Sequence, residues 1–136
     1  MELHEQLASV PLFAGLEPNV RRRLANVGKR RSYETGEAIV RAGETGTALY
    51  VILSGRAHAE QDGTTLGEMR AGDFFGELAL IEEHRRSATV VADDATECVL
   101  YPAWEFTSLL AEHPEIAVPI MTELIRRIHR REHHGA

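Results

Sequence analysis

The sequence predicts an α+β fold that is mainly β, because helical periodicity at both ends encloses a block of short strands. In residues 1–31 and 103–134, apolar residues recur at the spacing of a helix face. In residues 32–101, short apolar or alternating runs are separated by turn signals such as RAGETG, QDGT and ADDA. Many short strands at regular spacing are typical of a sandwich or a barrel-like roll. We expect a single domain over residues 1–136, which is long enough for a proper core.

The N-terminal segment predicts helices on both sides of Pro11. The first helix has an apolar face made of Leu3, Leu7 and Val10. A second helix is expected to begin near Pro18, which suits a first helical turn, and to end at Gly28.

The middle block predicts strands in the runs EAIV, ALYVIL, RAHAE, TLGEM, SATVV and ECVLY. The pair Asp62-Gly63 separates two of these runs and predicts a tight hairpin turn.

The C-terminal segment predicts two helices after Pro102. The first is expected to face the core with Trp104, Phe106, Leu109 and Leu110. The second carries one apolar stripe formed by Ile116, Ile120, Met121, Leu124, Ile125 and Ile128. Pro119 lies inside this pattern and removes a backbone hydrogen bond, so the second helix either kinks or begins there.

Composition favours a cytoplasmic protein over a membrane or nucleic-acid-binding one. The formal net charge is −6, which argues against binding of nucleic acid or an anionic membrane as the main role. The single cysteine, Cys98, rules out an internal disulfide and favours a reducing compartment. The N-terminus lacks the pattern of a secretory signal, and the longest apolar run, residues 48–53, is too short to cross a bilayer.

The run FFGELAL predicts an extended segment that turns at Gly76 into a short helical piece. Its first backbone amides are candidate donors to an anion, namely those of Glu77, Leu78 and Ala79. The Glu77 carboxylate can accept hydrogen bonds from sugar hydroxyls, while Arg86 has a planar guanidinium suited to a phosphate and Ser87 adds a hydroxyl and an amide. These groups describe a ribose-phosphate site. The alternative is that Glu77 and Arg86 form an internal ion pair.

The run FFGELALIEEHRRSATV, residues 74–90, closely resembles the phosphate-binding cassette of cyclic nucleotide-binding domains, a family that includes catabolite activators and cAMP-dependent kinase regulatory subunits. The segments VPLFAGLEPNVRRRLA and GEAIVRAGETGTALYVILSG, and the final helices, are similar to the family in the same order. The resemblance implies an eight-stranded β-roll, a jelly roll of the double-stranded β-helix type. N-terminal helices and two C-terminal helices are expected to flank this roll.

The resemblance also implies a role for each matching residue. Arg86 would bind the exocyclic oxygens of a cyclic phosphate, and Ser87 would donate to the phosphate and to the base. Glu77 would accept from the ribose 2′-hydroxyl, with help from the backbone of Gly76 and Leu78. Positions that tend to line the base pocket in the family are occupied here by Leu66 and Met69.

Base recognition departs from the family pattern. The last helix reads Arg131-Glu132 where the bacterial activator has a Thr-Ser pair, so Arg127, Arg130 or Arg131 is expected to stack on the purine. The resemblance implies that Ser87, directly after the cassette arginine, favours cAMP without excluding cGMP. No metal is expected.

We therefore expect a non-catalytic sensor in which cyclic nucleotide occupancy moves the C-terminal helix. The alternative is the same fold sensing a non-nucleotide effector, or acting as a ligand-free scaffold or dimerisation domain. The chain reaches Ala136 without a helix-turn-helix module, so it is expected to sense and not to act, as a stand-alone or excised domain. Leu124, Ile125 and Ile128 are candidates for a homodimer contact.

Three other patterns favour plain surface roles. HRREH, residues 129–133, matches a metalloprotease motif, but it lies at the end of the chain without a third ligand. His58 and His84 lack the paired arrangement of a metal-binding roll and are expected to be exposed polar residues. The arginine-rich runs in residues 21–31 and 126–127 are expected to be solvated.

Overall fold

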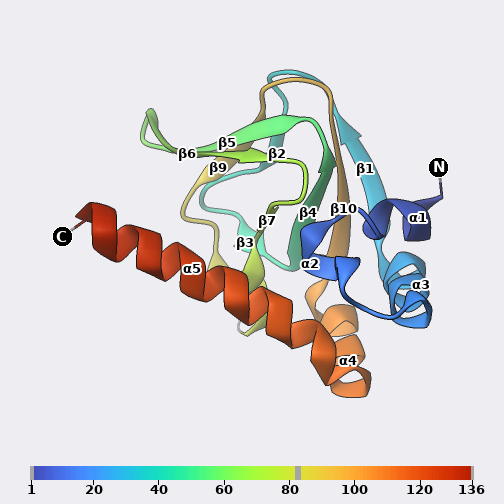
Figure 1. Cartoon of the computed structure of the whole chain (residues 1–136). Coiled ribbons are helices and arrows are strands. Elements are labelled where there is room, and N and C mark those ends of the chain that lie inside the picture. Colours follow the sequence, from blue (N-terminus) through green and yellow to red (C-terminus); the bar gives the residue numbers. More distant parts are fainter. Residues whose placement is uncertain (1, 82–83, 136) are drawn as a thin grey trace.

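The structure, a computed structural model, describes the backbone of residues 2–81 and 84–135, and all their side chains except those of residues 84 and 131–135. Three short helices begin the chain and pack on one side of a β-roll, and a long helix, α5, crosses the roll near the other end of the chain (Figure 1). The opening helices are α1 (Leu3–Leu7), α2 (Pro11–Ala14) and α3 (Pro18–Val27). As predicted, Pro18 is the first residue of its helix.

Two four-stranded antiparallel sheets form the roll, which confirms the mainly β fold. The first has the order β1 (Lys29–Tyr33), β10 (Thr96–Pro102), β4 (Ala48–Ser54) and β7 (Phe74–Phe75). The second has the order β2 (Ala38–Val40), β9 (Thr89–Ala92), β5 (Arg56–Gln61) and β6 (Thr64–Arg70). A further ladder joins β3 (Thr45–Gly46) to β8 (His84–Arg85).

The turn between β5 and β6 is the predicted hairpin. Asp62 and Gly63 both have positive φ, 52° and 80°, and they connect the paired residues Gln61 and Thr64. This is the conformation of a type I′ turn, which suits the twist of two antiparallel strands. The Asp-Gly signal is therefore confirmed.

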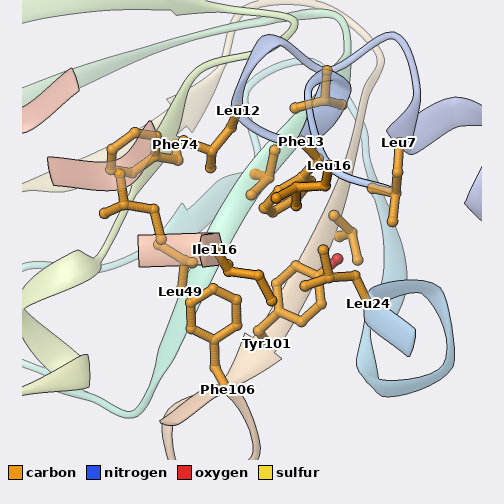
Figure 2. Packing of buried hydrophobic residues seen from close by; sticks show 14 of the residues in the cluster. Leu7, Leu12, Phe13, Leu16, Leu24, Leu49, Phe74, Tyr101, Phe106 and Ile116 are labelled. Carbon is orange, nitrogen blue, oxygen red and sulfur yellow. The ribbon is translucent and has the colours of Figure 1, made fainter. Parts of the chain in front are cut away.

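Two hydrophobic clusters stabilise the molecule. The larger one joins the helices to the first sheet, and Figure 2 shows Phe13, Tyr101 and Phe106 among its members. Phe13 meets Tyr101 edge to face, with ring centroids 6.2 Å apart. The smaller cluster lies inside the roll and includes Ile52, Phe75 and Cys98. Leu7 and Val10 are both buried in the larger cluster. The helix α1 ends at Leu7, however, so Val10 does not lie on the predicted helix face.

The first strand begins at Lys29, inside a basic run that the sequence places in the helical segment. Lys29, Arg30 and Arg31 are all exposed on this edge strand. Charged residues on an edge strand discourage pairing with other chains. The run is thus part of the roll, and its charges point largely to solvent.

The C-terminal part contains α4 (Ala103–Glu112), a turn of 3₁₀ helix, η2 (Pro114–Ile116), and α5 (Ala117–Gly135). Pro119 is the third residue of α5. The amides of a first turn have no partner within the helix, so proline is tolerated there. The alternatives for Pro119 are thereby resolved, because α5 begins just before it.

The expectation that Trp104 faces the core is wrong. Its side chain is 72% exposed, whereas Phe106 and Leu109 are buried. Residues two apart on an α-helix lie about 200° apart around its axis. A helix that buries Phe106 therefore turns Trp104 toward solvent.

The apolar stripe predicted on the last helix divides into two faces. Ile116 and Ile120 are buried, and Leu124 packs against the same cluster. An outward face, which we call the α5 stripe, consists of exposed Val118, Met121, Ile125 and Ile128.

Among the described residues, no helix combines the length and apolar character that crossing a membrane requires.

Candidate functional site

The cassette starts where β7 ends. Gly76 has φ 84°, a left-handed conformation that glycine adopts without strain, and it precedes the short 3₁₀ helix η1 (Glu77–Leu80). A Cβ atom at Gly76 would lie 2.5 Å from Nη1 of Arg86 and 2.8 Å from the carbonyl oxygen of Ala48. Glycine is thus required here for its conformation and for the close approach of Arg86.

Arg86 is a half-buried cation held by neutral groups. Its Nη2 donates a hydrogen bond of 2.9 Å to the carbonyl oxygen of Ala48, and its Cζ lies 5.8 Å from the centroid of the Tyr50 ring. Burial lowers the pKa of Arg86, and nearby Tyr50 and Glu77 oppose that shift. Among the carboxylates that the structure describes, none forms an ion pair with Arg86 within 4.0 Å.

Glu77 is paired with the C-terminal helix instead. Its Oε1 lies 3.6 Å from Nη1 of Arg127, which is on α5. The same guanidinium donates a hydrogen bond of 2.6 Å to the carbonyl oxygen of Phe74 and lies 4.3 Å from the centroid of the Phe74 ring. The alternative of an internal pair between Glu77 and Arg86 is therefore not what the structure has.

The remaining cassette residues occupy different environments. The amide of Ala79 donates to the carbonyl oxygen of Gly76 at 3.2 Å, which leaves Glu77 and Leu78 as the candidate amide donors among the three predicted. The Leu78 side chain is 51% exposed, and Ser87 is exposed directly after Arg86. The predicted cluster of free amides is smaller than expected because the 3₁₀ turn uses one of them.

The residues predicted to meet the base are not gathered at one point. Leu66 is exposed on β6, whereas Met69 packs against the inner cluster. Arg127 lies on Glu77 and Phe74, and Arg130 lies 3.3 Å from Glu123 on its own helix. The side chain of Arg131 lies outside the described residues, so the base contact stays a prediction.

Sequence reasoning missed the groups that hold Arg86. Tyr50 and the carbonyl of Ala48 are on β4, and Gly46 is on β3, where a Cβ atom would lie 2.7 Å from Cζ of Arg86. The spaced glycines were the available signal. Their meaning depends on how β3, β4 and the cassette come together, which no local pattern shows.

His58 is less exposed than predicted and is held by two carboxylates. Its Nδ1 lies 2.6 Å from Asp93 and its Nε2 lies 2.9 Å from Glu60. Within the described part of the chain, no group of three or more histidine, cysteine, aspartate or glutamate residues is arranged to hold a metal. The side chains of His84 and His133 lie outside the described residues.

Comparison with known proteins gives the same family as the cassette. Residues 30–113 match the cyclic nucleotide-binding domain family. Glutaminase 1 of Bradyrhizobium diazoefficiens is 35% identical over 127 residues, which are 91% of this chain and 21% of that protein. Cyclic AMP receptor protein of Thermus thermophilus is 33% identical over 123 residues, or 87% of this chain and 57% of that protein. The solved structure of cAMP-bound PfPKA-R has a TM-score of 0.78 at 29% identity, covering 95% of this chain and 43% of that one.

The fold and the charged cassette thus define a ligand-binding β-roll. The chain belongs to the cyclic nucleotide-binding domain family, of the type present in catabolite activators and kinase regulatory subunits. The chain spans less than two thirds of the length of each curated relative named above.

Proposed function

We propose that this chain is a non-catalytic regulatory domain that binds a 3′,5′-cyclic nucleotide, with cAMP as the preferred ligand. The observation that carries the proposal is the half-buried guanidinium of Arg86, held by a carbonyl oxygen and an aromatic ring. Keeping a cation partly out of water is costly unless an anion neutralises it. A cyclic phosphate is an anion of suitable size, and a guanidinium can donate two parallel hydrogen bonds to it.

The ribose would be bound by Glu77. Glu77 directly follows Gly76, whose backbone closely approaches the Arg86 guanidinium, so both charges border the same part of the cassette. A ligand with a phosphate next to a hydroxyl would use both groups. Ser87, directly after Arg86, supports cAMP without excluding cGMP, and the relatives named for cAMP support the same ligand.

We further propose that α5 transmits occupancy through Arg127. In the structure Arg127 connects α5 to the start of the cassette, through a hydrogen bond to Phe74 and an ion pair with Glu77. A ribose that engages Glu77 would change the environment of Arg127. The cassette and α5 would then move together, and a partner of α5 would detect the change.

The partner that we propose is a second copy of the chain. The α5 stripe repeats at intervals of three and four residues, which is the spacing of a coiled-coil seam. Leu124, which the sequence suggested for the dimer contact, packs against the larger hydrophobic cluster of its own chain. The proposed dimer seam therefore consists of the exposed residues Val118, Met121, Ile125 and Ile128.

Calorimetric titration with cAMP, cGMP and 5′-AMP tests the proposed ligand. We expect micromolar or tighter binding of cAMP, weaker binding of cGMP, and no comparable binding of 5′-AMP. If none of the three binds, the domain senses another effector or is a ligand-free scaffold, and the proposal is wrong.

A further inference from the structure

Arg86 and two aromatic rings form a stack that links the roll to the cassette. Tyr50 on β4 is paired in register with Phe75 on β7. Their rings are stacked, with centroids 5.0 Å apart and an interplanar angle of 4°. The Arg86 guanidinium lies over the Tyr50 ring at 5.8 Å. The position of the Tyr50 ring is therefore fixed by a strand pair, and Arg86 is placed against that ring.

Space around the guanidinium is restricted by backbone. Cβ atoms built on Gly46 and Gly76 would each come within 2.7 Å of guanidinium atoms of Arg86. The carbonyl oxygen of Ala48 holds Nη2 from the strand that carries Tyr50. One strand thus supplies both the hydrogen-bond acceptor and the aromatic surface.

We propose that Tyr50 is a positioning residue for Arg86, whose ring holds the guanidinium in the orientation that receives the cyclic phosphate. This inference rests on the proposed function, since it assigns the phosphate to Arg86. An arginine over an aromatic face is attracted by the ring and keeps its N–H groups free at the edge for an anion. Without the ring, the long side chain would have more rotamers to lose when a ligand binds.

A double-mutant cycle measured with cAMP tests this role. Tyr50→Phe keeps the ring and should bind within about twofold of the wild type, whereas Tyr50→Leu should weaken binding about threefold to tenfold. In an Arg86→Ala background, Tyr50→Leu should have no further effect, because no guanidinium remains to be positioned. Equal losses in both backgrounds would mean that Tyr50 is merely structural and would overturn the proposal.

A second measurement needs no nucleotide. Burial raises the pKa of the Tyr50 phenol above its ordinary value, and the positive charge of Arg86 partly offsets this rise. Labelling tyrosine at Cζ with ¹³C allows the phenol to be titrated by NMR. Replacement of Arg86 by alanine should raise the pKa of Tyr50 further, and an unchanged value would overturn the contact. If the wild type binds no cyclic nucleotide but this shift is present, the proposed ligand is wrong and the pairing of Tyr50 with Arg86 stands.

Discussion

The Glu77 carboxylate faces α5 through one of its two oxygens. Oε1 faces Arg127 at 3.6 Å, and 23% of the side chain is exposed. A carboxylate oriented by a cation is a good acceptor for a hydroxyl, and a hydrogen bond to a charged group contributes about 1.5–3 kcal/mol. Glu77 can thus keep its ion pair with Arg127 of α5 while it accepts a hydrogen bond from a ribose hydroxyl.

Glu77→Gln should reduce the preference for cAMP over 2′-deoxy-cAMP. In the wild type we expect this preference to be about tenfold or more. The variant keeps the shape of the side chain but loses its charge, so its preference should be several times smaller. Competition binding with the two nucleotides measures the ratio, and an unaltered ratio would count against ribose binding by Glu77.

His58 predicts a pH-dependent part of the stability. Hydrogen bonds to Glu60 and then Asp93 raise the pKa of His58 above its ordinary 6.5. The native state therefore binds the proton more tightly than the unfolded chain. The extra stability is complete below pH 6.5 and disappears as the pH rises through the raised value.

The difference in unfolding free energy between wild type and His58→Asn isolates this part, because the other titrating groups cancel. We expect urea unfolding to give a larger difference at pH 6 than at pH 9. A difference that stays constant across this range, or grows with pH, would show that the two carboxylates do not stabilise an imidazolium.

At the scale of elements, the guanidinium of Arg127 links α5 to the cassette. Arg127 contacts Phe74 and Glu77 on the cassette side, and Glu123 on its own helix at 3.7 Å. Helix ends and ligand-binding loops belong to the less stable parts of a fold, so such a contact can control whether they move together.

Arg127→Met should loosen both α5 and the cassette. Without nucleotide, we expect faster hydrogen exchange in residues 74–80 and in the second half of α5. The addition of cAMP should then change exchange in α5 less than it does in the wild type. Arg126→Met is the matched control, because the neighbouring Arg126 is exposed and forms no such contact in the structure. Equal hydrogen exchange in the two variants would mean that Arg127 does not couple α5 to the cassette.

Element by element, the sequence predicts what local chemistry decides. The Asp62-Gly63 turn and the helix start at Pro18 depend on nearby residues alone, and both are as predicted. The two-residue strands β3 and β8 were missed, because such short strands exist only through their partners, and these two pair with each other. Trp104 was misplaced because several apolar residues in α4 offered more than one helix face.

At the scale of the whole molecule, the α5 stripe remains exposed. Its four members are 52–62% exposed, and the seam that they form runs along a helix that extends away from the roll (Figure 1). An exposed row of large apolar side chains at coiled-coil spacing is typical of a helix that pairs with another.

A Met121→Glu, Ile125→Glu variant should be monomeric in sedimentation experiments in which the wild type forms dimers. Burial of two carboxylates in an apolar seam is strongly unfavourable. Since both residues are already exposed, the variant should keep its fold and its cAMP affinity. A wild type that stays monomeric at high concentration would contradict the homodimer.

The site as a whole required the fold to be known. The cassette motif identifies Glu77 and Arg86, but their partners come from distant parts of the chain: Ala48 and Tyr50 for Arg86, and Arg127 for Glu77. Sequence reasoning predicted Arg127 as one of three arginines that stack on the base, because the resemblance implies that the last helix caps the base. Which group its guanidinium meets is decided by the packing of α5 on the cassette.

The affinity of Arg86→Ala for cAMP, measured beside that of the wild type, tests most directly whether this domain binds a cyclic phosphate. Arg85→Ala is the matched control, since its neighbouring guanidinium donates to the carbonyl oxygen of Gly43 instead. We predict a loss of at least about 1.5–3 kcal/mol, or tenfold and more, for Arg86→Ala, and little change for Arg85→Ala. Equal affinity of the Arg86→Ala variant and the wild type would contradict the account.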